Sequence, residues 1–410
     1  MKKLLLLLAM IIAMVSCGGK TAEKKDAPTE AKKVSGNIRF ATWTGNPEED
    51  KALKMMIAEF EKANPGIKVE YTPLTGDYNQ VLTTQMSGGQ GPDVFYYDAY
   101  TAGQYIGDDY LEPIEGYDLS DFYPAMVAPF VKDGKTYGIP KDFSTLALYY
   151  NKDMFTKAGL PEPKDKMTWE EFVDLSKKLT KGDVVGFGGN FDLARLKYAA
   201  EASGAKIETA DGKANFTDPE VVKGIKQFVD MHNEKILVTA EEKGAGWAGD
   251  LLGTGKVAMV MEGPWIQPFL AQNFKDLKYG VVEMPLINGK PATAAYTVSL
   301  GINADSKNKE AARVFINFMT SAEGMEKWSA AYKVLPTRKS LVAKMGLATD
   351  PLLKAHVAGA EYANLWAGSP NLRTTYLNFG KTMPLILQGK VKLEDGLKQI
   401  TETTNAEAGK

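Results

Sequence analysis

The order of strand and helix signals from Asn37 onward constrains the fold more than any other feature of this sequence. Residues 38–43 form an apolar run typical of a strand, and Pro47 followed by three acidic residues marks a helix start. Apolar residues between positions 53 and 60 recur at helical spacing. Because strand and helix signals then keep alternating, we expect a mostly parallel sheet with helices on both faces.

The alternation continues along the chain, whose 410 residues are enough for two domains with sizeable cores. Thr168 and Glu171 form a capping box that predicts a helix running toward Leu179. The last ten residues are polar, and we expect them to be frayed. Further strands are predicted at 67–71, 93–98, 257–261 and 278–283, and further helices at 78–86, 219–231, 309–320 and 321–331.

Residues 1–16 have the composition of an export signal. Lys2 and Lys3 precede twelve apolar residues, 4–15, and Ser16 is the small residue before the predicted cut. A transmembrane helix needs about 20 apolar residues, so this run is too short for a stable span. The alternative is a short membrane anchor that is never cleaved.

Cys17 is the only cysteine, which excludes an intramolecular disulfide, a CxxC redox pair and a cysteine-based zinc cluster. Residues 14–17, Met-Val-Ser-Cys, resemble the lipobox of bacterial lipoproteins. The resemblance implies that Cys17 is diacylated and becomes the mature N-terminus, and two acyl chains suffice for stable anchoring. The alternative is a cysteine buried in a core or free on the surface.

Residues 17–36 are predicted to be a lipidated flexible tether. The segment is rich in Lys, Glu, Ala, Thr and Pro and has almost no large apolar residue. Such a composition buries too little surface to offset the entropy of ordering. As a random coil it would span roughly 20–25 Å.

The charge balance gives no electrostatic footprint for nucleic acid. The chain carries 49 basic and 51 acidic residues, a net charge of -2. Removing Lys2 and Lys3 with the signal leaves 47 against 51, or -4. A near-balanced surface of this kind predicts no nucleic-acid partner.

The sequence offers little for catalysis or metal binding. Its two histidines, His232 and His356, are interpreted as surface or capping residues, and no HExxH or GxSxG motif occurs. The glycine-rich run 87–92 ends a helix and precedes a strand, the reverse of a phosphate-binding loop. We therefore predict no catalytic residue, no metal and no cofactor.

Aromatic residues are more informative, because many lie at predicted strand ends beside Gly, Pro, Asp, Asn or Thr. In open parallel sheets, ligands bind beyond the carboxyl ends of the strands. Flat aromatic faces together with a few polar groups suit a sugar, whose hydroxyl groups need hydrogen-bond partners once they are buried. The set comprises Trp43, Tyr96, Tyr97, Phe143, Trp247, Trp265, Tyr296 and Trp366.

Several segments together resemble the family 1 extracellular solute-binding proteins of ABC transporters, the maltose-binding and glycerol-phosphate-binding class. The most specific is 137–155, YGIPKDFSTLALYYNKDMF, in which Lys141 departs from the usual apolar residue. The others are Gly-Pro-Asp-Val at 91–94, Gly-Lys-Val-Ala-Met at 255–259 with Gly-Pro-Trp at 263–265, and the late-helix segments 306–312 and 315–319.

The resemblance implies an α/β, two-lobed periplasmic-binding-protein type II fold whose lobes are joined by crossover hinge strands. Lobe one is expected to be discontinuous and to comprise 37–142 plus 291–335. Lobe two would then comprise 143–290 plus 336–405.

The same resemblance implies a ligand-binding site between the lobes. Asp98, Lys141 and Asp142 would exchange hydrogen bonds with hydroxyl groups, and Arg373 would clamp vicinal hydroxyls or a charged group. The full expected set is Trp43, Thr44, Gly45, Tyr78, Asp98, Lys141, Asp142, Trp247, Gly263, Trp265, Tyr296 and Arg373.

The function implied is capture of a mono- or oligosaccharide and its delivery to an ABC transporter permease. The protein would be a non-enzymatic monomer in the periplasm or on the outer face of the cell membrane, held there through Cys17. One alternative keeps the fold and binds glycerol phosphate or another small anion, for which Lys141 and Arg373 argue. Another is a surface lipoprotein enzyme acting on glycans, because acidic residues are abundant.

Overall fold

The computed structural model describes residues 34–407. The predicted signal peptide (1–16), Cys17 and the tether as far as Lys33 lie outside the described residues. Within the described part of the chain, no helix combines the length and the apolar character needed to cross a membrane.

The first sheet has the strand order β13-β12-β3-β1-β2. A further strand, β6, pairs with residues 295–301 of β12. Its strands are β1 (Gly36–Trp43), β2 (Ile67–Leu74), β3 (Val94–Asp98), β6 (Gly138–Thr145), β12 (Ala294–Ile302) and β13 (Asn364–Leu365). Its helices are α1 (Pro47–Ala63), α2 (Tyr78–Ser87), α3 (Ala102–Gly107), α11 (Lys309–Thr320) and α12 (Ala322–Tyr332).

The second sheet has the order β11-β7-β10-β8-β9. Its strands are β7 (Ala147–Asn151), β8 (Val185–Gly189), β9 (Leu237–Thr239), β10 (Val257–Glu262) and β11 (Tyr279–Val282). Its helices are α5 (Lys152–Ala158), α6 (Trp169–Leu179), α7 (Leu193–Glu201), α8 (Pro219–Asn233), α9 (Ala248–Gly253), α10 (Ile266–Asn273), α15 (Leu372–Leu387) and α16 (Leu393–Glu407). Shorter elements are α4 (Pro124–Val127), the hairpin β4 (Val131–Lys132) and β5 (Lys135–Thr136), α13 (Lys339–Lys344) and α14 (Lys354–Gly359).

Local capping signals set the helix starts as the sequence predicted. Thr168 and Glu171 form a reciprocal capping box at the start of α6. Asn46 caps α1 by accepting a hydrogen bond of 2.8 Å from the backbone of Glu49. The prediction of frayed last residues was wrong up to Glu407, because α16 continues to that residue and packs Ile400 and Thr404 inward.

The sheets are mixed, whereas a mostly parallel sheet was expected. The strands β1, β2 and β3 pair in parallel, as do β8, β9 and β10. The strands β6, β7, β11 and β12 pair antiparallel to their neighbours, apart from the short parallel pairing of β12 with β13. The antiparallel strands lie at or beside the segments that connect the two sheets. The inference of a parallel sheet from alternating strands and helices does not apply to such connecting strands.

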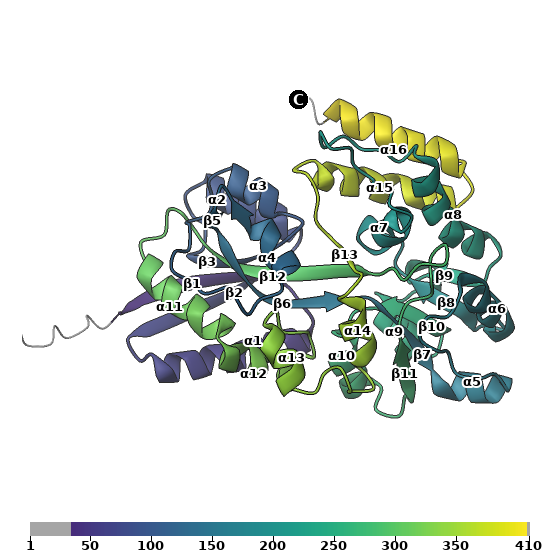
Figure 1. Cartoon of the computed structure of the whole chain (residues 1–410), viewed down its shortest axis with the longest axis horizontal. Helices are drawn as coiled ribbons and strands as arrows, with labels where there is room; N and C mark the ends of the chain where they lie inside the picture. Colours follow the sequence, from purple (N-terminus) through teal and green to yellow (C-terminus); the bar gives the residue numbers. More distant parts are fainter. Residues whose placement is uncertain (1–33, 408–410) are drawn as a thin grey trace, which may run out of the picture. The chain divides into compact units, whose positions relative to one another are not determined.

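The two largest of four hydrophobic clusters in residues 34–407 define two lobes, and β6 and β12 pass between them. Ile139 of β6 lies in the first core, and Leu146, just beyond its end, lies in the second. Ala294 and Ile302 place the two ends of β12 in the second and first cores. Figure 1 shows β6 and β12 lying side by side in the region between the two lobes.

The lobe boundaries given above stay a prediction, but one segment packs elsewhere than expected. Leu341 of α13 belongs to the first core, and the Ser340 hydroxyl donates to Asp121 at 2.6 Å. We therefore propose that residues 336–345 belong with lobe one, although the predicted division gives them to lobe two.

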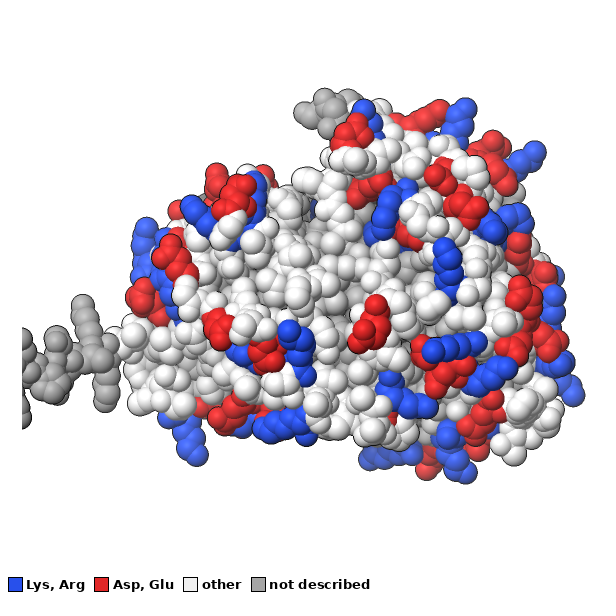
Figure 2. Space-filling view, viewed as in Figure 1, with Lys and Arg blue, Asp and Glu red and all other residues white. Residues whose placement is uncertain are grey.

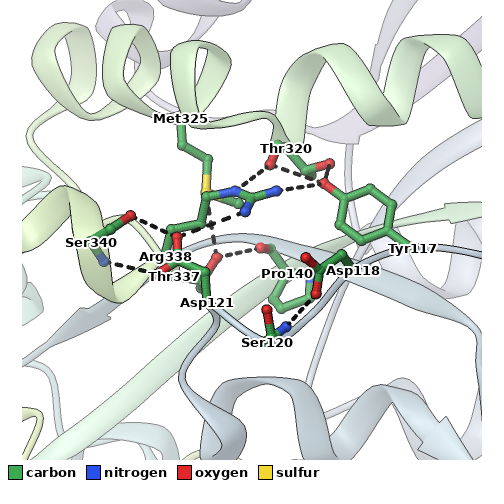
Figure 3. A network of polar contacts seen from close by, with 10 residues as sticks. All are labelled: Tyr117, Asp118, Ser120, Asp121, Pro140, Thr320, Met325, Thr337, Arg338 and Ser340. Carbon is green, nitrogen blue, oxygen red and sulfur yellow. Dashed lines mark hydrogen bonds and ion pairs between the residues drawn. The ribbon is translucent and has the colours of Figure 1, made fainter.

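A polar network fixes the segment around Arg338 beside strand β6 (Figure 3). Arg338 Nε donates to the Thr320 carbonyl at 3.0 Å, and its guanidinium lies 4.5 Å from the centre of the Phe122 ring. The Thr337 hydroxyl donates to the Pro140 carbonyl at 2.5 Å. The network therefore supports the backbone of β6 immediately before Lys141.

His356 lies on α14 and is fully buried, so its interpretation as a surface or capping residue was wrong. Its Nε2 lies 2.7 Å from the Tyr149 hydroxyl, and its Nδ1 lies 2.8 Å from the Thr145 carbonyl. Burial lowers the pKa of this imidazole to about 4, although the Thr145 hydrogen bond opposes the shift. The neutral ring therefore joins α14 to the crossover between β6 and β7.

We predict that His356 makes the fold sensitive to acid. Its pKa is lower in the folded than in the unfolded chain, so only the unfolded chain takes up the proton as pH falls below 6.5. Stability should fall between pH 6.5 and pH 4 by up to about 3 kcal/mol. Urea unfolding of wild type and His356→Gln across this range measures it. Equal pH slopes for the two proteins would contradict the prediction.

Candidate functional site

A cavity of about 440 Å³ lies where elements of both lobes meet. Trp43 and Asp98 end the parallel strands β1 and β3, and Trp265 follows the end of β10. The site therefore lies beyond the carboxyl ends of strands, as open α/β sheets favour. Its size is within the range of small-molecule sites, about 300–1,000 Å³.

Nine of the twelve residues expected at the site line this cavity. They come from both lobes and from the crossover strands, although they are spread over most of the described chain. These nine are Trp43, Thr44, Gly45, Asp98, Lys141, Asp142, Trp247, Trp265 and Tyr296.

Tyr78, Gly263 and Arg373 do not line the cavity. The Tyr78 hydroxyl donates to the Tyr96 carbonyl at 2.7 Å, and its ring packs edge-on against Trp43. A Cβ atom on Gly263 would come within 2.1 Å of the Trp265 ring, so this glycine makes room for that ring. Arg373 forms an ion pair of 2.9 Å with Asp77. We propose supporting roles for these three in place of ligand contact.

A β-bulge places two neighbouring charged side chains at the cavity. Asp142 pairs with Val298 and Pro140 pairs with Ser299, which leaves Lys141 as the extra residue on β6. In a regular strand, successive side chains point to opposite faces, and a bulge changes that direction locally. Lys141 and Asp142 accordingly both line the cavity and form an ion pair with each other.

Lys141 is held by aromatic rings as well as by its acid. Its ammonium lies 4.6 Å from the centre of the Tyr96 ring and 4.1 Å from that of Trp328. The Trp328 indole also donates to Asp142 at 2.6 Å. The side chain is only 2% exposed, so Asp142 and the two rings take the place of water around the Lys141 charge.

Glu49 is a cavity residue that the sequence analysis missed. It lies in the first turn of α1, and a Cβ atom on Gly45 would come within 2.0 Å of its carboxylate. The Tyr332 hydroxyl donates to it at 3.4 Å. Burial raises the pKa of Glu49 to about 7, and the nearby Lys141 charge opposes part of that rise.

Asp98 is the second cavity acid with a shifted pKa. Burial raises the pKa of Asp98 to about 6. Hydrogen bonds of 3.0 Å from the Thr101 backbone and hydroxyl oppose part of that rise. Asp98 and Glu49 therefore both change charge near neutral pH. The cavity becomes more negative as pH rises from about 6 to about 7.

Aromatic side chains form much of the cavity wall, and other rings hold them in place. Trp43 packs edge-on against Tyr96 with ring centres 5.2 Å apart, and Trp265 packs edge-on against Tyr296 at 5.9 Å. The Tyr296 hydroxyl donates to the Ala194 carbonyl at 2.7 Å. Both lobes thus present rigid flat faces to one space.

Eight lining residues were not predicted. Trp366 belonged to the aromatic set noted in the sequence, so that signal was available for it. Glu49 was interpreted only as a first-turn helix acid, and the others carry no sequence signal that sets them apart. The eight are Asn46, Glu49, Ser144, Thr297, Val298, Tyr332, Val334 and Trp366.

Charge is distributed unevenly over the face of the molecule that Figure 2 shows. In Figure 2, blue and red side chains gather over the outer parts of the two lobes, and the surface between them is mostly white.

Within residues 34–407, no group of three or more His, Cys, Asp or Glu side chains is placed to hold a metal ion.

The fold and the interlobe cavity define a two-lobed solute-binding protein, and comparison with known proteins gives the family. Residues 55–355 match the family model described as bacterial extracellular solute-binding protein. Because the match covers more than half of the chain, the protein belongs to this extracellular family. The expected family is thereby confirmed, and the similarity to solved structures confirms the two-lobed fold.

Individual relatives agree with this assignment. The galactooligosaccharide-binding protein of Bacillus subtilis is 26% identical over 97% of this chain and 95% of its own length. An ABC substrate-binding protein of Listeria monocytogenes, solved with cycloalternan, has a TM-score of 0.84 at 26% identity and covers 92% of this chain and 99% of its own. A solute-binding protein of Thermotoga lettingae, bound with alpha-D-tagatose, has a TM-score of 0.82 at 25% identity. The similarity covers 91% of this chain and 99% of the Thermotoga chain.

We predict that Asp142→Ala destabilises the protein by about 3–5 kcal/mol, because it leaves the Lys141 ammonium buried without its acid. The double variant Lys141→Met/Asp142→Leu removes both charges and should be markedly more stable than the single variant. Urea unfolding at pH 8 measures both. A double variant no more stable than Asp142→Ala would show that the unpaired charge is not the cause.

Proposed function

We propose that the protein captures a mono- or oligosaccharide between its two lobes and delivers it to an ABC transporter permease. The observation that carries the proposal is the cavity itself, in which aromatic faces from both lobes surround carboxylates and hydroxyls. A sugar ring packs its C–H face on such rings, while its hydroxyls donate to the carboxylates.

The comparisons support a carbohydrate as the ligand class. Two of the relatives are named for galactooligosaccharides and arabinooligosaccharides, and two of the structural neighbours were solved with cycloalternan or tagatose. Binding by closure requires only that the ligand favours the closed arrangement of the lobes. We infer that the protein acts by binding and release, and that its cavity acids serve as hydrogen-bond acceptors rather than as catalysts.

The electrostatics of the cavity argue against the anionic alternative. The residues that line the cavity include three acids, Glu49, Asp98 and Asp142, and one base, Lys141. Lys141 is already paired with Asp142, and Arg373 is paired with Asp77. No lining cation is therefore left to neutralise a phosphate or carboxylate.

We predict that calorimetry at pH 8 will show binding to at least one neutral sugar in a panel of galactose, tagatose, maltotriose and mannotriose. Galacturonate and glycerol 3-phosphate should bind at least tenfold more weakly, because each anion would face the carboxylates. Tenfold corresponds to about 1.4 kcal/mol, less than the several kcal/mol that buried like charges can cost. Tight binding of glycerol 3-phosphate with no binding of any sugar would refute the proposal.

Asp98→Asn supplies a matched control for the charge argument. It keeps the size of the side chain and removes one carboxylate, so the ratio of anion to neutral affinity should rise. An unchanged ratio would mean that the cavity charge does not set the selectivity.

We further propose that the chain is exported, lipidated at Cys17 and held near the permease by the tether, as a monomer. Tethering raises the effective concentration of the loaded protein at its membrane partner. The extracellular character of the family supports export, and the sequence of residues 14–17 supports lipidation.

We predict that Cys17→Ser releases the protein from the membrane fraction while sugar affinity measured on purified protein stays within about twofold, that is about 0.4 kcal/mol. Fractionation followed by calorimetry tests both parts. Membrane retention of the variant would contradict anchoring through this residue, and a large loss of affinity would contradict the separation of anchor and binding site.

A further inference from the structure

Trp366 is shared between the lobes. One part of its surface lines the cavity, and its ring is also stacked on Tyr100, with centres 5.1 Å apart and planes 17° apart. Tyr100 follows strand β3 of lobe one. The segment that carries Trp366 leads directly into α15 of lobe two. The stack therefore joins the two lobes outside the cavity.

Tyr376 on α15 completes the aromatic cluster. Its ring lies 6.0 Å from Tyr100 and 5.9 Å from Trp366, edge-on to both. The neighbouring residues Leu372 and Phe379 lie in the second core, so Tyr376 is fixed to lobe two. Tyr100 thus inserts against two rings of the opposite lobe.

An ion pair from α15 joins the same two lobes through another element of lobe one. Arg373 Nη2 is 2.9 Å from Asp77 Oδ2, and Asp77 is the N-cap of α2 in lobe one. Arg373 lies three residues before Tyr376 on α15, one helical turn from the ring that packs against Tyr100. The ion pair and the stack are therefore carried by the same turn of α15.

Buried polar contacts fix the Trp366 segment to lobe two. Lys197 of α7 donates to Asn364 at 2.6 Å and to Glu201 at 2.9 Å. The Ser369 hydroxyl donates to Glu208 at 2.7 Å. Side chains on both sides of Trp366 are thus held by lobe two, although the backbone of β13 also pairs with β12 of the first sheet, whereas Tyr100 belongs to lobe one.

We propose that Tyr100, Trp366 and Tyr376, together with the ion pair of Asp77 and Arg373, form an interlobe clasp. Tyr100 is a positioning residue in this clasp, because it holds Trp366 in its place in the cavity wall without touching the cavity. The wall is then complete only when the lobes are closed, and the clasp favours closure before a ligand arrives. Only the effect on ligand binding rests on the proposed function.

The Tyr100 hydroxyl gives the proposal a sharp control. It is buried and has no well-aligned hydrogen-bond partner within residues 34–407, although the Arg373 guanidinium is near enough to lower its pKa. The clasp therefore needs the ring of Tyr100 and not its hydroxyl. Tyr100→Phe should behave as wild type, and Tyr100→Ala should not.

The test uses the ligand-free full chain. Small-angle X-ray scattering should give a larger radius of gyration for Tyr100→Ala/Arg373→Gln than for wild type, and Tyr100→Phe should match wild type. Arg313→Gln is a matched control, because Arg313 pairs with Glu112 and Glu310 within lobe one. The fluorescence of Trp366 is obtained by subtracting the spectrum of the same protein carrying Trp366→Phe. Its emission maximum should shift to longer wavelength only in Tyr100→Ala/Arg373→Gln.

Affinity for maltotriose, or for tagatose if maltotriose does not bind, should fall about tenfold in Tyr100→Ala and recover in Tyr100→Phe. If Tyr100→Ala does not fold, Asp77→Asn/Arg373→Gln breaks only the exposed ion pair and should still enlarge the ligand-free protein. Unchanged scattering and Trp366 emission in the clasp variants would overturn the proposal even where sugars bind. Absence of sugar binding with altered scattering would leave the clasp standing and remove the proposed function instead.

Discussion

The pairing of β6 with β12 is the interaction on which the rest of the structure depends. These two strands run antiparallel from one core to the other, so the same hydrogen bonds that build the first sheet also join the lobes. The bulge at Lys141 lies within this pairing and brings two charged side chains to the cavity. The polar network around Arg338 supports the same stretch of β6 from the side. The hinge and the centre of the binding site are therefore one piece of structure.

Cavity charge follows from that arrangement. A lysine buried between two rings and an acid is stable only while all three partners stay in place. The carboxylates of Glu49 and Asp98 remain as acceptors with raised pKa values near 7 and 6. Such a site offers hydrogen bonds and flat rings but no free cation among its lining residues. Hydroxyl-rich neutral ligands match this chemistry, and anions do not.

Much of the fold could be predicted from local signals. The capping box of Thr168 and Glu171 and the apolar run at 38–43 each depend on only a few neighbouring residues. Aromatic residues at strand ends, such as Trp43, could be singled out for the same reason, whereas Asp98 was expected only through the family resemblance. The Lys141 bulge, the burial of His356 and the cavity position of Glu49 depend on which elements meet in space. Periodicity and spacing do not carry that information. Family resemblance supplied the two lobes, but it also suggested Arg373 as a ligand contact, whereas Arg373 pairs with an acid outside the cavity.

Amide hydrogen exchange with and without a bound saccharide tests the central claim most directly, because it reports both lobes and the hinge in one experiment. We expect the ligand to slow exchange together in residues 43–46 of lobe one, 263–267 of lobe two and 141–145 of the hinge strand β6. Protection confined to one lobe, or located away from these segments, would contradict a ligand held between closing lobes.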